Sequence, residues 1–446
     1  MRVASSRQFY VFASIFLPFP LQMANFIQLL KVRMTIRRRF AMARQEKQQH
    51  VAAVLPFVLP VKSLTIKDVA DVADFPDLYI NCVFFAKTWA LWTFVLGVWS
   101  FAGQPWPMTD LAHVAVHASQ LPENVQRDLL ESLRARRIDP KFHYASYKQS
   151  QKWLALHEAW SPSRTDAECA AVYDRAFLAA ADALRSSRVR LIGLGCGGGQ
   201  KDARLLGSLT GQGREITYTP CDISLALVLT SLRAAQSAVP GIRCHPLVCD
   251  LAGAVDLPRV LLHQESSPTI HLITFFGMIP NFEPEVILPR LAALLRPGDL
   301  LLLSANLAPG PDYAAGVQRV LPGYDNPQTR DWLLTFLHDL GVEPGDGSVR
   351  FSIEDSKSGL KRIVADFCFA RGRALPVYGE RFEFREGDKI RLFFSYRYTP
   401  SLVGSVLSEY KLAILGQWIT PSGEEGVFLC GKAVAAGRFS GFPEQP

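Results

Sequence analysis

Apolar positions recur at helical spacing in three segments of the first half of the chain. Residues 121–136, 146–158 and 166–186 each carry apolar side chains three or four positions apart, so we predict a helix over each segment. Residues 138–144 contain a proline and are predicted to link the first helix to the second. A regular pattern that begins near residue 108 therefore opens with a helical region.

From residue 188 onward the pattern alternates between short apolar runs and amphipathic stretches. The apolar runs predict strands over residues 189–194, 215–219, 242–248, 269–276 and 299–304, and the amphipathic stretches predict helices over residues 201–208, 225–237 and 284–295. Such alternation is typical of a parallel sheet with helices on both faces. Ligands of such sheets bind at the carboxyl ends of the strands, where the strand order reverses.

The alternation stops after residue 304 and resumes near the end of the chain. Residues 307–397 contain one predicted helix and several short strands, which indicate a smaller α+β unit inserted into the sheet domain; the helix is 328–340 and the strands are 349–353, 362–370, 381–385 and 389–395. A helix over residues 401–412 and two strands, 413–420 and 426–433, close the chain. A terminal antiparallel hairpin on a doubly wound parallel sheet is typical of the class I, seven-strand methyltransferases, and we predict this α/β fold.

Residues 1–107 do not share this pattern. Two stretches, 9–30 and 79–103, are largely apolar, and the second is long enough to cross a bilayer, which takes about 20 apolar residues. Two interpretations stay open: a membrane anchor, or an over-long start-site assignment that is not translated. We expect membrane association only if this region is translated, and otherwise a monomer in the cytoplasm.

Charge and cysteine content exclude several function classes. The chain has 48 Lys and Arg against 41 Asp and Glu, and the whole excess of +7 lies in residues 1–107, which leaves the remainder neutral. A neutral remainder gives no electrostatic support for nucleic-acid binding. The eight cysteines form no CxxC pair, and His113 and His117 have no third ligand at a recognisable spacing, so we predict free thiols and no metal site.

A glycine-rich turn follows the first predicted strand of the sheet. Gly195, Gly197, Gly198 and Gly199 permit a tight turn and the close approach of a ligand to the backbone. Taken alone, this pattern is also compatible with an ordinary strand–helix turn. Asp222 and Asp250 end the next two strands, where carboxylates could bind ribose and adenine, although each could instead cap a helix. The glycine turn, Asp222 and Asp250 follow three successive strands and should lie at the same edge of the sheet. This arrangement favours a nucleoside cofactor.

The fourth strand ends at residues 276–284, where an acceptor would face such a cofactor. Asn281 offers both hydrogen-bond donors and acceptors there, as binding the head group of an amino acid requires. Its alternative role is a turn or a cap before the next helix.

Six segments share motifs with one methyltransferase family. They are residues 138–144 (IDPKFHY), 158–165 (EAWSPSRT), 194–201 (LGCGGGQK), 281–284 (NFEP), 324–326 (YDN) and 395–398 (SYRY). Through these motifs the chain resembles, from about residue 108 to residue 434, the histidine-specific S-adenosylmethionine (SAM) methyltransferases of ergothioneine synthesis. The resemblance implies a SAM-binding domain over residues 188–306 and 398–435, and a substrate-binding domain over residues 108–187 and 307–397.

The same resemblance implies roles for individual residues. SAM would be bound by Gly195, Gly197, Lys201, Asp222 and Asp250. The acceptor would contact Asn281, Tyr324, Ser395, Phe393 and Trp160, and the catalytic residues would be Asn281, Tyr324 and Tyr144, with a tyrosine relaying the amine proton.

One departure from the family bears on the substrate. The family's Glu-x-Ser, which binds the imidazole of histidine, stands here as Phe393-Phe394-Ser395. A buried imidazole N–H without its partner costs about 1–3 kcal/mol. We therefore predict N-methylation of the α-amine of an amino acid or related small amine other than histidine. Two alternatives stay open: a methyltransferase fold that has lost its acceptor chemistry, and a methyltransferase for another class of small molecule.

Overall fold

The computed structural model describes residues 112–262, 269–356 and 358–433. The two interpretations of residues 1–107 therefore lie outside the described residues. Within the described ranges, no helix combines the length and hydrophobicity needed to span a bilayer.

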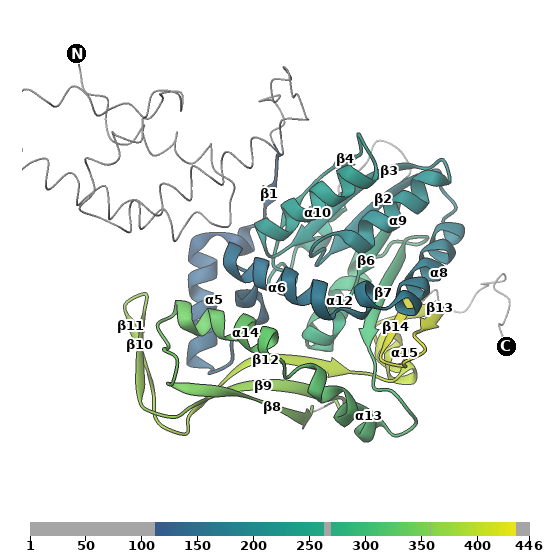
Figure 1. The fold of residues 1–446 in the computed structure, drawn as a ribbon. Coiled ribbons are helices and arrows are strands. Elements are labelled where there is room, and N and C mark those ends of the chain that lie inside the picture. The colour runs from purple at the N-terminus through teal and green to yellow at the C-terminus, as the bar shows by residue number, and fades with distance from the viewer. Residues whose placement is uncertain (1–111, 263–268, 357, 434–446) are drawn as a thin grey trace, which may run out of the picture. The chain divides into compact units, whose positions relative to one another are not determined.

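The centre of the fold is a mainly parallel sheet (Figure 1). Its strands run in the order β1-β5-β3-β2-β6-β7-β14-β13, with β4 beside β3. The strands are β1 Ala115–Val116, β2 Arg188–Leu194, β3 Glu215–Asp222, β4 Arg243–Cys244, β5 Leu247–Val248, β6 Ile270–Phe275, β7 Leu300–Asn306, β13 Leu412–Ile419 and β14 Glu425–Lys432. Only β14 runs antiparallel to its neighbours β7 and β13, which confirms the predicted class I methyltransferase sheet with its terminal hairpin.

Helices cover both faces of this sheet with separate apolar cores. One face packs against α8 (Ala167–Ala183), α9 (Gln200–Gly211) and α10 (Leu225–Ala238). The other packs against α11 (Leu257–Leu261), α12 (Pro284–Leu294) and α15 (Pro400–Glu409). The strand order reverses at β2, which lies between β3 and β6, and this reversal opens a crevice at the carboxyl ends of the strands.

A second layer combines the segment before β2 with the segment between β7 and β13. An antiparallel sheet of order β12-β9-β8 packs with α5 and α14 around an apolar core. Its strands are β8 Gly347–Asp355, β9 Lys361–Phe369 and β12 Lys389–Arg397, with the ribbon β10 Arg373–Val377 and β11 Glu380–Phe384. Its helices are α5 Pro122–Arg134, α6 Tyr147–Trp160, α7 Pro162–Thr165, α13 Tyr313–Val320 and α14 Pro327–Asp339, with short 3-10 segments η3 Ala118–Gln120, η4 Pro140–His143 and η6 Leu321–Gly323. A further 3-10 segment, η5 Ile279–Asn281, follows β6 of the large sheet. In Figure 1 the strands of this layer lie below the large sheet.

The structure differs from the predicted elements in a few places. The strand predicted over residues 242–248 is two short strands, β4 and β5, because Pro246 lacks the N–H that a central strand needs. The strands β1 and β10 and the helices α7, α11 and α13 were not predicted. The first has only two residues, and β10 contains Pro376 and pairs with β11 alone, so neither produces a clear period-two pattern.

A buried carboxylate joins α9 to the middle of the large sheet. Asp202 accepts hydrogen bonds from Tyr218 Oη of β3 at 2.6 Å and from Thr274 Oγ1 of β6 at 2.8 Å. A Cβ atom at Gly193 of β2 would lie 2.1 Å from Asp202 Oδ2, so only glycine permits this approach. The two bonds hold α9 in register with three adjacent strands.

We expect Tyr218→Phe to lower the free energy of unfolding by about 1–3 kcal/mol, because the buried Asp202 carboxylate then loses one of its two hydroxyl donors. Urea denaturation of the two proteins measures the difference. Tyr378→Phe is the matched control, since Tyr378 is 61% exposed. Equal unfolding midpoints for the two variants would contradict a supporting role for the Tyr218 hydroxyl.

Candidate active site

A cavity of about 920 Å³ lies at the carboxyl ends of β2, β3, β5 and β6. The structure brings every predicted site residue to its wall: Tyr144, Trp160, Gly195, Gly197, Lys201, Asp222, Asp250, Asn281, Tyr324, Phe393 and Ser395. Their individual roles stay predictions. Sites for small molecules commonly fall between about 300 and 1,000 Å³, so this volume is at the upper end of that range.

The backbone angles of the glycine turn would be strained in any residue other than glycine. Gly195, Gly197 and Gly199 have φ angles of 65°, 53° and 75°, in the left-handed region. A Cβ atom at Gly197 would lie 2.7 Å from the ring of Trp153, and one at Gly199 would lie 2.6 Å from Cα of Ser231. The turn therefore needs glycine for its conformation and for the close packing around it.

Asp222 ends β3 directly beside this turn. Its carboxylate accepts hydrogen bonds from the backbone N–H of Gly197 at 3.0 Å and of Ser224 at 3.1 Å. Burial raises the pKa of Asp222 to about 6, and the two backbone donors limit this rise. The carboxylate is consequently ionised at neutral pH and lines the cavity as a hydrogen-bond acceptor.

Lys201 lies in the first turn of α9, behind the glycines. Its ammonium group donates to Tyr173 Oη at 2.7 Å and lies 3.7 Å from a carboxylate oxygen of Glu425. Burial lowers the pKa of Lys201, and the attraction of Glu425 opposes that effect. Tyr173 and Glu425 have no predicted role; a charged residue at the start of the otherwise apolar strand β14 was the one signal that could have indicated Glu425.

Asp250 is paired within the protein. Its Oδ2 accepts a hydrogen bond from Lys141 Nζ at 2.7 Å, and its Oδ1 accepts from the N–H of Ala252. Lys141 is 9% exposed and also forms an ion pair with Asp128. Burial alone would lower the pKa of Lys141, but the nearby carboxylates raise it. Lys141 stands in one of the six family-like motifs but has no predicted role, and it is a further charged residue of the wall.

Asn281 closes the short segment η5 after β6. Its side-chain amide has no hydrogen-bond partner among the described residues, and it lines the cavity. Two residues later Glu283 accepts from Tyr396 Oη at 2.5 Å and from Arg362 Nη1 at 3.1 Å, and it is paired with Arg137. Glu283 thereby fixes the loop that carries Asn281 to strands β9 and β12 of the second layer.

Aromatic rings form one side of the cavity. Tyr144 packs against Trp153 and Trp332, with ring centroids 5.7 and 5.4 Å apart. Phe393 lies 6.0 Å from Tyr324 and 6.2 Å from Trp332, and it is 8% exposed. The position where the family has a carboxylate is therefore part of an apolar wall. The two tryptophans were not predicted, because their spacing along the helices resembles that of ordinary core residues.

The titratable groups beside these rings are poor bases. Burial and the negative charge of Asp222 raise the pKa of Tyr144 well above its usual value, so this phenol keeps its proton at neutral pH. Burial and the positive charges of Lys201 and Arg164 lower the pKa of His157 to about 3. The raised pKa does not favour Tyr144 as a base, and its part in a proton relay stays a prediction.

The hydroxyl of Tyr324 is the centre of a polar cluster. It lies 3.0 Å from Ser395 Oγ and accepts hydrogen bonds from Arg397 Nη2 at 2.7 Å and, more weakly, from Asn306 Nδ2 at 3.4 Å. Tyr324 and Ser395, predicted to contact the same acceptor, are thus direct neighbours. Arg397 has no predicted role, although it lies within the family-like segment 395–398.

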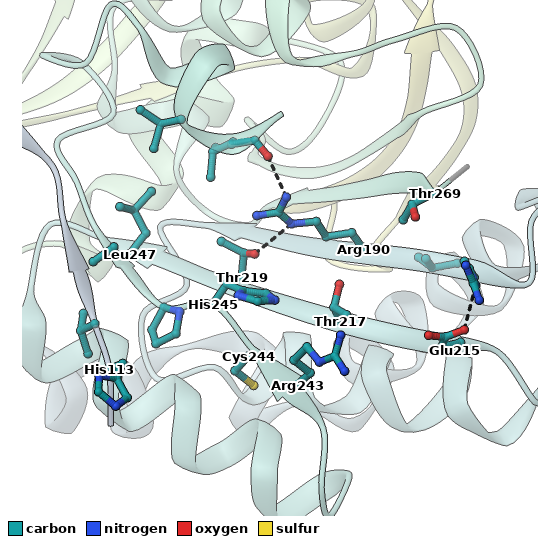
Figure 2. A pocket seen from close by; sticks show the side chains of 17 residues that line it. His113, Arg190, Glu215, Thr217, Thr219, Arg243, Cys244, His245, Leu247 and Thr269 are labelled. Carbon is teal, nitrogen blue, oxygen red and sulfur yellow. Dashed lines mark hydrogen bonds and ion pairs between the residues drawn. The ribbon is translucent and has the colours of Figure 1, made fainter. Parts of the chain in front are cut away.

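A second cavity of about 880 Å³ lies over the amino-terminal halves of β2, β3 and β4 (Figure 2). Arg190 donates there to Thr219 Oγ1 at 3.2 Å and to the carbonyl of Leu261 at 2.9 Å, and Arg188 is paired with Glu215. None of the predicted site residues lines this cavity. It lies at the opposite ends of these strands from the glycine turn.

We expect the elevated pKa of Asp222 to make stability depend on pH. The pKa is about 6 in the folded protein and 3.8 in the reference aspartate, so the free energy of unfolding should fall as pH rises from about 4 to about 6 and then level off. The wild type should lose up to about 3 kcal/mol more than Asp222→Asn over this range. Denaturant titrations at several pH values measure this, and parallel profiles would exclude the effect. Both proteins retain Asp202, which cancels in the comparison.

Comparisons with known proteins also indicate a SAM-dependent methyltransferase. The family described as "Histidine-specific methyltransferase, SAM-dependent" matches residues 125–432. The N-methyltransferase imqF of Aspergillus flavus is 25% identical over 248 residues, covering 54% of this chain and 67% of imqF. The N-methyltransferase fsqC of Aspergillus fumigatus is 23% identical over 246 residues, covering 54% and 66%.

Among solved structures, magnesium protoporphyrin IX methyltransferase (ChlM) from Synechocystis PCC 6803 with bound SAH has a TM-score of 0.35. It is 11% identical, over 64% of this chain and 95% of ChlM. The family match covers well over half of the chain. The chain belongs to the histidine-specific, SAM-dependent methyltransferase family, and it is a SAM-dependent methyltransferase.

Proposed function

We propose that the enzyme N-methylates the α-amine of an amino acid, or of a closely related small amine, whose side chain is larger or more apolar than that of histidine. The observation that carries this proposal is the position of Phe393. It lies between Tyr324 and Trp332 in the cavity wall, where the family has an imidazole-binding carboxylate. An apolar or aromatic side chain would pack against this wall without leaving a polar group unpaired.

The residues of the opposite wall fit SAM. The glycine turn lines the cavity with its backbone, and Asp222 provides an ionised acceptor where a ribose would lie. We assign Gly195, Gly197, Lys201, Asp222 and Asp250 to this half of the cavity. When bound, SAM supplies a methyl group on a positively charged sulfur, ready for in-line displacement.

The chain's own contribution to the reaction is orientation of the acceptor. The unpaired amide of Asn281 and the hydroxyls of Tyr324 and Ser395 are available to hold the head group of the acceptor. Orientation of two reactants can supply several kcal/mol, and about 7–11 in the best intramolecular systems. An α-amine has a pKa near 8, so a substantial part of the acceptor is protonated at neutral pH. Tyr144 and His157 are poor bases, and we expect the proton to pass to water before methyl transfer.

Two further observations bear on the atom that is methylated and on the compartment of the enzyme. The two curated relatives are both named N-methyltransferases, which favours nitrogen as the methyl acceptor. The cysteines of the described residues are free thiols, as in proteins of the reducing cytoplasm. We place the enzyme in the cytoplasm as a monomer, acting on a small molecule.

Calorimetry with S-adenosylhomocysteine (SAH), followed by mass spectrometry against a panel of amino acids and amines, tests the proposal. We expect SAH to bind, and we expect the methylated products to come from aromatic or large apolar amines rather than from histidine. Tight SAH binding with no methylated product would favour a protein that has lost its acceptor chemistry. Strong methylation of histidine would contradict the proposed substrate class.

Asn281→Ala is the matched variant for this experiment. The amide lies on the acceptor side, so we expect methylation to fall about 10- to 100-fold while SAH affinity stays near that of the wild type. An equal loss of methylation activity and of SAH affinity would instead assign Asn281 to the cofactor half of the cavity.

We expect Phe393→Glu to shift activity toward histidine. A carboxylate at this position would accept a hydrogen bond from an imidazole N–H, and it would be an unpaired buried charge beside an apolar side chain. The ratio of kcat/KM for histidine to that for the best aromatic amine should rise about 10- to 100-fold. Phe393→Leu, which keeps the wall apolar, serves as the control and should not raise this ratio. An unchanged ratio in Phe393→Glu would show that Phe393 does not determine specificity.

A further inference from the structure

Arg397 is a buried cation in the wall of the active-site cavity. It ends β12 and is 7% exposed. Nη1 donates to the carbonyl oxygens of Leu307 at 3.0 Å and Glu424 at 3.5 Å, and Nη2 donates to Tyr324 Oη at 2.7 Å. The buried Nε has no hydrogen-bond partner. The guanidinium thus hydrogen-bonds only to neutral oxygens, and it also lies over the ring of Tyr324, with Cζ 5.1 Å from the ring centroid.

The other cations of the wall all have carboxylate partners. Their ion pairs are Arg127–Asp128, Arg137–Glu283, Lys141–Asp128, Lys141–Asp250 and Lys201–Glu425. Across residues 112–262, 269–356 and 358–433, no carboxylate lies within 4.0 Å of Arg397. Buried charges are normally paired, because removing a charge from water is costly unless an opposite charge compensates it. The cavity therefore contains one buried positive charge whose counter-ion the described protein does not supply.

The same guanidinium determines what the Tyr324 hydroxyl can do. A phenol has two acceptor lone pairs and one hydrogen. Arg397 and Asn306 occupy the acceptor positions, so the hydrogen of Tyr324 is directed to Ser395 or into the cavity. A hydrogen donor beside an unpaired guanidinium is the arrangement that binds a carboxylate.

We propose that Arg397, acting with Tyr324, binds the carboxylate of the acceptor, so that the enzyme selects amino acids over the corresponding carboxylate-free amines. This inference rests on the proposed function. SAM also carries a carboxylate, and the shared chemistry is an anion beside a guanidinium. We assign the acceptor's carboxylate, because Arg397 shares a strand with Phe393 and Ser395 and contacts Tyr324, whereas Lys201 is the cation beside the glycine turn.

Matched substrate pairs test this assignment with the full chain: tryptophan and tryptamine, tyrosine and tyramine, phenylalanine and phenethylamine. For the pair that the wild type methylates best, kcat/KM for the amino acid should exceed that for the amine on the order of 10- to 100-fold. In Arg397→Met this preference should collapse, through loss of kcat/KM for the amino acid, while SAH affinity is retained. Arg397→Lys, which keeps the charge without the planar fork, should retain part of the preference.

Arg391→Met is the control for a purely structural effect. Arg391 lies on the same strand but is paired with Glu354 and Asp366, away from the cavity, so its loss should leave the preference for the amino acid intact. If Arg397→Met does not fold, the comparison of Arg397→Lys with the wild type carries the test.

Three results would overturn the inference. The first is a wild type that methylates the amine as well as the amino acid, which leaves the proposed N-methylation standing. The second is an equal loss for both substrates in Arg397→Met. The third is a loss of SAH affinity in that variant, which would assign the guanidinium to the cofactor's carboxylate. Failure to methylate either member of any pair, with SAH bound, would instead count against the proposed function itself.

Discussion

The carboxylate of Asp202 is the interaction on which the geometry of the active site depends. It lies one residue beyond Lys201 and receives the hydroxyls of Tyr218 and Thr274 from the two strands that flank β2. Burial raises its pKa to about 6, and the two hydroxyl donors oppose that rise, so the ionised form persists at neutral pH. Because α9 and three strands are tied together at this point, the glycine turn and the ends of those strands are held at fixed positions around one cavity.

The acceptor side depends on a second set of contacts, centred on Glu283. Its bonds to Tyr396 and Arg362, and its ion pair with Arg137, attach the loop after β6 to the antiparallel sheet. Burial alone would raise the pKa of Glu283, but these donors lower it, so the carboxylate stays charged across the neutral range. The cofactor turn belongs to the large sheet and the aromatic wall to the second layer, and Glu283 keeps the two in contact beside Asn281.

The cavity combines a cofactor half, which we expect to be common to the family, with an acceptor half that differs in this chain. In our proposal, the glycine turn, Asp222 and the partly buried Lys201 bind SAM, which is common to the whole family. Phe393 would then contact the acceptor's side chain, and Arg397 its head group. Both residues stand on β12, apart from the glycine turn, so substitutions on this strand could change the acceptor without changing the cofactor site.

The sequence alone determined the order of the main strands and helices, the terminal hairpin, the glycine turn and Asp222. These features follow from local hydrophobic periodicity and from glycine and aspartate residues at the ends of strands. Only the tertiary structure decided which charges meet. Lys141 pairs with Asp250 across 109 positions, and Arg397 meets Tyr324 across 73. Such contacts depend on how the strands are ordered and how the second layer packs beneath them, and no local pattern records them. The sequence therefore indicated the cofactor, and only the fold brought the guanidinium of Arg397 to the hydroxyl of Tyr324 in the cavity wall.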